Sequence, residues 1–115
     1  MTEKGTYMFI QHNPAEHRYE AIDDGAGTVA GIAAYRDQPG SRAFTHTQVS
    51  DAYQGQGIAS ELIRFAAEDV RGAGLRLVPY CPYVAGWLKK HPEYTGIVDW
   101  PQPESAAQNQ EESAR

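Results

Sequence analysis

Short blocks of apolar residues, some alternating with polar ones, fill the first half of the chain, and this pattern is typical of β-strands. An apolar run covers residues 7–10, and an alternating run covers residues 18–22 before the turn signal at residues 23–25. Residues 28–35 are small or apolar throughout, which predicts a strand covered on both faces. Residues 43–49 are rich in β-branched and aromatic side chains. We therefore expect four strands joined by hairpins.

A helical period follows. From Ile58 to Val70 apolar residues recur on one stripe with charged residues opposite, and glycines at 72 and 74 end the pattern. Residues 75–78 predict a fifth strand, and residues 83–90 a short helix that Pro92 ends. Four strands, a helix, a strand and a helix predict an α+β fold. We expect a mixed, mainly antiparallel twisted sheet with a β-α-β-α C-terminal half.

Length and composition limit the organisation of the chain. Its 115 residues fit one domain, which we assign to residues 1–100. Residues 101–115 contain no large apolar side chain, so we expect a disordered tail there. One cysteine rules out an intrachain disulfide. The sequence has no signal-peptide core and no apolar stretch of about 20 residues. We therefore expect a cytoplasmic protein without a membrane partner.

Charge narrows the possible partners. The net charge is −5, and no stripe of Lys and Arg is present, so nucleic acid is not expected as a partner. His, Cys, Asp and Glu occur without the spacing of a metal site. The sequence leaves the oligomeric state open.

The segment 49–60 joins a strand to the long helix through a glycine-containing loop. The first N–H groups of a helix have no internal acceptor and carry a partial positive charge, and glycine lets a loop wrap closely around an anion. A phosphate or pyrophosphate is the natural ligand.

A P-loop would need Lys-Ser or Lys-Thr after the glycines, and a dinucleotide fingerprint would need a third glycine at Ser60. Both alternatives fail, although an ordinary structural turn remains possible. The predicted binding residues are Val49, Gln54, Gly55, Gln56, Gly57, Ile58, Ala59 and Ser60.

The same segment resembles the acetyl-CoA motif of the GNAT superfamily, Gln/Arg-x-x-Gly-x-Gly/Ala, with Gln54, Gly57 and Ala59 at its defined positions. It is similar in particular to a branch of small GNAT-like domains that has three further sequence blocks. Here these blocks read His-Thr-Gln-Val at 46–49, Cys-Pro-Tyr-Val at 81–84 and His-Pro-Glu-Tyr at 91–94. The resemblance extends from about residue 19 to residue 98. It implies a GNAT-like fold with reduced N-terminal helices, because few residues separate the first two strands.

The resemblance also implies a function, namely transfer of an acetyl group from acetyl-CoA to an amine acceptor. The acceptor stays open between a protein amine, a polyamine and a small metabolite. The pantetheine arm would enter between residues 45–49 and 75–80, the pyrophosphate would lie on the N–H groups of residues 56–60, and a backbone N–H near Val49 would polarise the thioester carbonyl.

Two residues are candidate catalytic residues, and each also has a structural interpretation. Cys81 lies where a strand meets the start of a helix, a position that favours a thiolate, but a lone cysteine also packs as a small hydrophobe. A histidine side chain can act as a general base, so His46 is a candidate for that role, or it is structural. Alternation along the strand predicts that His46 shares a face with Phe44 and Gln48.

Two departures from the branch favour a second function. Gln48 replaces a usual glutamate, and Trp87 stands nearest to the helix tyrosine that larger relatives use as a proton donor. A non-enzymatic acetyl-CoA sensor or interaction module is therefore the alternative.

Overall fold

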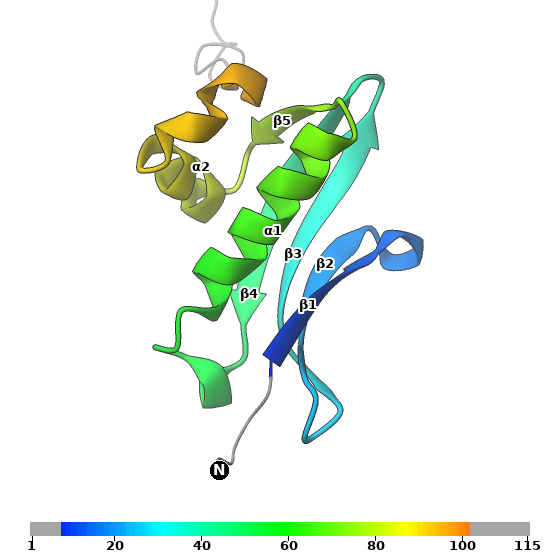
Figure 1. Cartoon of the computed structure of the whole chain (residues 1–115), viewed down its shortest axis with the longest axis vertical. Helices are drawn as coiled ribbons and strands as arrows, with labels where there is room; N and C mark the ends of the chain where they lie inside the picture. Colours follow the sequence, from blue (N-terminus) through cyan, green and yellow to red (C-terminus); the bar gives the residue numbers. More distant parts are fainter. Residues whose placement is uncertain (1–7, 102–115) are drawn as a thin grey trace, which may run out of the picture.

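The computed structural model describes residues 8–101 of the chain, and its elements follow the predicted order, so the α+β class is confirmed (Figure 1). The strands are β1 (Met8–Asn13), β2 (Arg18–Asp23), β3 (Thr28–Gln38), β4 (Ser41–Val49) and β5 (Arg76–Pro79). The helices are α1 (Ile58–Gly72) and α2 (Pro82–Lys89), with 3₁₀ turns η1 (Pro14–Glu16), η2 (Asp51–Tyr53) and η3 (Pro92–Ile97). Most of the tail expected after residue 100 lies outside the described residues.

The five strands form one sheet in chain order, β1-β2-β3-β4-β5. The first four strands pair antiparallel, and β4 pairs parallel with β5. Between β1 and β2 the chain makes only the short turn η1, as the reduced N-terminal half predicts. The crossover from β4 to β5 runs through α1, which lies along one face of the sheet (Figure 1).

The small residues of β3 allow α1 to approach the sheet closely. A Cβ on Gly31 would lie 3.1 Å from the Gln48 carbonyl oxygen and 3.3 Å from the Leu62 side chain, so a larger residue would push the helix away. The expectation that β3 is covered on both faces is wrong. Val29 is 42% exposed, and the described helices leave the other face of the sheet uncovered (Figure 1). Residues 28–35 are small and apolar because α1 approaches β3 closely.

The core lies between the sheet and the two helices. Its largest fully buried side chains come from three strands, both helices and η3: Tyr19, Phe44, Leu62, Ile63, Val70, Leu77, Val84 and Tyr94. Burial of this cluster holds the sheet and helices together.

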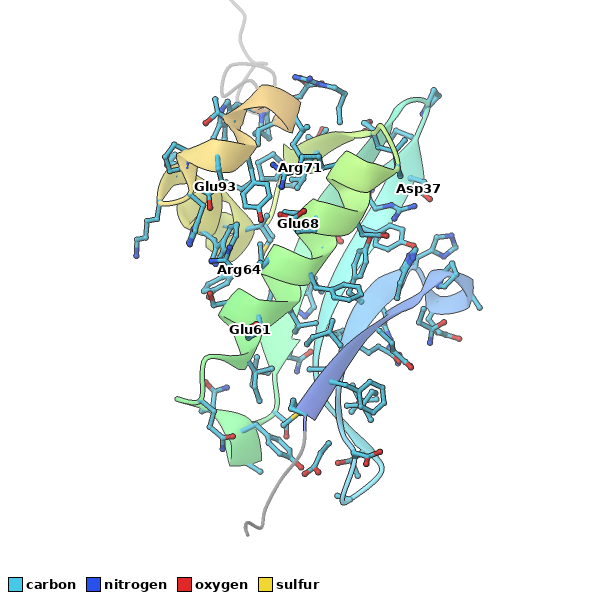
Figure 2. All side chains as sticks on the ribbon, in the orientation of Figure 1. Asp37, Glu61, Arg64, Glu68, Arg71 and Glu93 are labelled. Atoms are coloured by element: carbon cyan, nitrogen blue, oxygen red, sulfur yellow. The ribbon has the colours of Figure 1, made fainter. Side chains whose placement is uncertain are left out.

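Contacts on the outer side of α1 fix the C-terminal elements. The Tyr94 hydroxyl of η3 donates to a Glu68 carboxylate oxygen at 2.6 Å, and the Arg71 guanidinium bonds the same oxygen at 2.6 Å. One turn earlier, Arg64 faces Glu93 with 4.0 Å between nitrogen and oxygen (Figure 2). Exposed ion pairs of this kind add little stability, but together with the buried Tyr94 ring they keep η3 and α2 beside α1.

Candidate functional site

The turn before α1 has the conformation that its glycines predict. Gly55 and Gly57 lie in the left-handed region, with φ of 79° and 76°, and no atom lies within 4 Å of a Cβ placed at either position. Gly57 caps α1 without any side-chain hydrogen bond, and the first bond inside the helix runs from the Glu61 N–H to the Gly57 carbonyl. The N–H groups of the first turn therefore lack an acceptor among the described residues. They present a positive helix end to solvent.

A surface hollow of about 190 Å³ lies at these N–H groups. Hereafter called the nest hollow, it is lined by Val49, Tyr53, Gln54, Gly55, Gly57, Ile58, Ala59, Ser60 and Tyr83. Seven of the eight predicted binding residues thus meet in one place. Gln56 is the exception, because it lines a neighbouring hollow with Met8, Ile10, Ile58 and Glu61.

Side chains within the turn hold it in shape. The Gln54 side-chain amide donates to the Val49 carbonyl at 2.7 Å, so it ties the loop back to the end of β4. Tyr53 donates its hydroxyl proton to Asp23 at the β2–β3 turn. This bond lowers the pKa of Asp23. The Gln54 side chain therefore stabilises the loop, and the backbone N–H groups are the hydrogen-bond donors available to a ligand.

The long helix and α2 meet beside the nest hollow. The Trp87 indole N–H donates to the Ser60 hydroxyl oxygen at 2.8 Å. Trp87 also stacks on His91, with 3.6 Å between ring centroids, and the His91 Nδ1–H donates to the Trp87 carbonyl at 2.7 Å. Because its N–H is used, Trp87 is a structural support here. The Ser60 hydroxyl accepts from Trp87 and retains its own proton for a ligand.

Tyr83 is a site residue that sequence reasoning missed. It lines the nest hollow from α2 and is 44% exposed, and partial burial raises the pKa of its hydroxyl. The available signal was its spacing of four residues from Trp87, which puts both aromatic rings on one side of a helix. Its place beside the first turn of α1 depends on how the two helices pack.

The strands β4 and β5 separate beyond Phe44. Their pairing ends at Phe44 with Pro79, and the N–H groups of Tyr80 and Cys81 both donate to the Phe44 carbonyl, at 3.0 and 2.9 Å. Further along β4, the Ser50 N–H donates to the Ala30 carbonyl of β3 at 2.8 Å. Because backbone groups alternate sides along a strand, those of Thr47 and Val49 face the gap toward β5.

Cys81 lies at the end of this gap, directly before α2. It is 6% exposed, and its Sγ is 3.4 Å from the Thr47 hydroxyl oxygen. The thiol therefore packs on the α1 side of the sheet, against the strand whose backbone faces the gap.

His46 lies on the opposite face of the sheet from Cys81. A β-bulge shifts the register between β3 and β4 at Ala34 and Tyr35, so Phe44 and His46 do not share a face. The predicted common face of His46 with Phe44 is therefore wrong, because one extra residue reverses the alternation. His46 does lie beside Gln48, with 3.2 Å between Nε2 and Oε1, and both are exposed. The structure thus separates the two candidate catalytic residues.

Within residues 8–101 no three His, Cys, Asp or Glu side chains come together as a metal site would require. None of the described helices is both long and apolar enough to cross a bilayer.

Comparisons with known proteins agree with the fold. The family described as GCN5-related N-acetyl-transferase matches residues 18–97, whereas no curated protein matches the chain. The solution structure of a GCN5-like protein from Staphylococcus aureus is similar, with a TM-score of 0.63, 23% identity, and coverage of 83% of this chain and 91% of the other. A GCN5-related N-acetyltransferase from Sphaerobacter thermophilus matches with a TM-score of 0.51 and 21% identity, covering 54% of this chain and 20% of its own. At these identities the structures support the fold alone.

Proposed function

The chain belongs to the GCN5-related N-acetyltransferase family, and on this premise we propose that it transfers the acetyl group of acetyl-CoA to an amine. The uncapped first turn of α1 carries the proposal. Two left-handed glycines and free N–H groups line the nest hollow there. A diphosphate matches this arrangement because several aligned N–H groups and the helix dipole stabilise negative charge together.

The gap between β4 and β5 continues the proposed site. The pantetheine arm of the substrate would run along the edge of β4 beyond Phe44, where the backbone groups of Thr47 and Val49 have no strand partner on this side among residues 8–101. The Val49 N–H would then donate to the thioester carbonyl oxygen as negative charge develops on it. A donor in this role typically contributes about 2.7–4 kcal/mol to transition-state stabilisation.

The acceptor would approach from the face that the described helices leave uncovered. His46 lies on that face next to Gln48, so it would take the proton from the incoming ammonium, directly or through water. The amine nitrogen then attacks the acetyl carbon, the carbon–sulfur bond breaks, and CoA leaves as its thiolate. The thiolate then takes a proton from water.

We expect calorimetry to show CoA binding at micromolar strength. We also expect a thiol reporter to show CoA release that depends on an added amine. The amine panel should contain peptides with a free N-terminus, lysine peptides, polyamines and small metabolic amines, each with a protein-free control. Binding without release across the whole panel would favour the sensor, which the uncharged Gln48 in place of a carboxylate also supports. Absence of CoA binding would contradict both functions.

The role of Cys81 distinguishes direct acetyl transfer from a two-step transfer. In a two-step variant its thiolate attacks the acetyl carbon and releases CoA, and the amine then displaces the thiolate. We propose direct transfer, because Cys81 is buried on the face opposite His46. Cys81→Ala should therefore retain amine-dependent release within about tenfold, since it loses only packing of a small side chain. Intact-protein mass spectrometry after acetyl-CoA treatment should show no hydroxylamine-labile acetyl. One such acetyl that disappears in Cys81→Ala would establish the two-step route.

A further inference from the structure

The strand registers place a row of side chains across the uncovered face of the sheet. The row runs through Asn13, Arg18, Ala34 and His46, which pair directly across β1, β2, β3 and β4. Ala33, the residue before Ala34, is fully buried, so alternation turns Ala34 away from α1. Arg18 and His46 are two strand spacings apart, which puts their Cα atoms about 10 Å from each other. In the row, only the methyl group of Ala34 lies between them.

A second arginine borders Ala34 along the same strand. Arg36 follows Ala34 by two residues, and the buried Tyr35 between them shows that the alternation continues. The extra residue of the bulge belongs to β4, so it leaves the faces of β3 unchanged. The Arg36 side chain is exposed, and it joins none of the ion pairs within residues 8–101. We call the surface formed by Arg18, Ala34, Arg36 and His46 the Ala34 platform.

The two signs of charge at the Ala34 platform are unequally accessible. Glu20, the carboxylate that pairs with Arg18, has a side chain that is only 4% exposed. Its oxygens accept hydrogen bonds from Gln11, Asn13 and Arg18, at 2.8, 3.0 and 2.7 Å. The Arg18 side chain is 31% exposed and uses its Nε–H for this pair, so the donors on its two terminal nitrogens remain available within the described part of the chain. A ligand on the platform therefore meets positive charge.

A hollow of about 200 Å³ lies beside the platform. Its lining residues are all uncharged: Val29, Ala30, Gly31, Ile32, Gln48 and Ser50. Ile32 and Gln48 pair directly across β3 and β4, two residues from the pair formed by Ala34 and His46, so the two pairs share a face. The hollow therefore suits an uncharged group of a ligand that also reaches His46.

We propose that the acetyl acceptor is a small amine that carries a carboxylate, namely an α-amino acid with an uncharged side chain. This inference rests on the proposed function, because it takes His46 as the base. The amine would lie at His46, the carboxylate at Arg18 and Arg36, and the side chain in the hollow. Arginine suits this role because its planar fork of donors matches the two oxygens of a carboxylate.

The chemistry of the transfer is the same as for any amine. His46 takes the ammonium proton, the amine nitrogen bonds to the acetyl carbon, and the carbon–sulfur bond breaks, which gives an N-acetylamino acid and CoA. A polyamine would instead bring further positive charge toward Arg18 and Arg36. The Glu20 carboxylate is buried and engaged by three donors, so it is not available to compensate that charge.

Acceptors that differ only in the carboxylate test the proposal on the full chain. L-Alanine, L-valine and L-leucine are compared with their amides, and CoA release is measured at saturating acetyl-CoA. Arg36→Gln should lower kcat/KM for the amino acids about threefold to tenfold, mainly through KM, as expected for one partly exposed charge-assisted contact. It should leave kcat/KM for the amides within about twofold. The amides are less basic amines, but this difference is the same for wild type and variant and cancels in the comparison.

Lys89→Gln is the matched control, with the same charge change on α2, where Lys89 lies 5.7 Å from the centroid of the Trp100 ring. It should leave kcat/KM for both kinds of acceptor at the wild-type value. Arg18→Gln should act on the amino acids as Arg36→Gln does, with thermal unfolding measured because this variant also loses the pair with Glu20.

Release with spermidine or lysine peptides but with none of the amino acids would overturn this inference and leave the proposed function intact. The same holds if Arg36→Gln affects amino acids and amides equally. If no amine of either kind promotes CoA release, the proposed function fails and this inference fails with it.

Discussion

Gly57→Glu should weaken CoA binding at least about a hundredfold. Gly57 has a φ of 76° and open space where a Cβ would lie, so the new side chain can extend over the first turn of α1. Its carboxylate would accept from the free N–H groups and occupy the place of the diphosphate. Two like charges about 4 Å apart near a protein surface repel by about 4 kcal/mol. Solvent screening reduces this value, but about 3 kcal/mol already corresponds to the expected change.

Gly74→Glu is the matched control for that variant. Gly74 lies just beyond the other end of α1, with a φ of 74° and equally open space. Both variants therefore carry the same left-handed backbone strain, about 1–2 kcal/mol, and the same added charge. Calorimetry should show wild-type CoA affinity for Gly74→Glu, with thermal unfolding measured for both proteins. Equal affinity of Gly57→Glu and wild type would show that the diphosphate does not bind at the start of α1.

The turn could be predicted from the sequence because its physics is local. Glycines followed by a regular apolar stripe specify both a left-handed loop and the helix that begins after it. Gly55, Gly57 and the first residues of α1 depend on few other parts of the chain. The helical stripe also identified buried residues of α1 such as Leu62, Ala66 and Val70, all of which lie in the core.

The faces of β4 could not be predicted in the same way. Alternation holds only until a bulge, and nothing in the residues 43–49 marks the one between Phe44 and His46. That single extra residue placed His46 on the uncovered face and Thr47 beside Cys81. Contacts between residues far apart in the sequence could not be predicted either. The bond from Trp87 to Ser60 joins residues that are 27 positions apart, and it forms only because α2 packs against α1.

Val49→Pro should lower amine-dependent CoA release by about a hundredfold to a thousandfold, the usual cost of removing one oxyanion donor. Proline lacks the N–H group, and strands tolerate it where that group faces away from the sheet. At Val49 this condition is met, because the neighbouring Ser50 N–H makes the bond to β3. The substitution therefore removes the proposed donor without removing a hydrogen bond between β3 and β4.

Val49→Ala separates the loss of this N–H from the loss of side-chain packing. Val49 packs partly against the core, so both variants lose side-chain contacts there, but alanine keeps its N–H. Release rates measured at saturating acetyl-CoA should stay within about threefold of wild type for Val49→Ala, and CoA affinity should change little in either variant, since the oxyanion contact strengthens only as the reaction proceeds. Equal rates for the alanine and proline variants would mean that the Val49 N–H does not hold the oxyanion. A donor elsewhere along the open edge of β4 would then have to stabilise the developing charge.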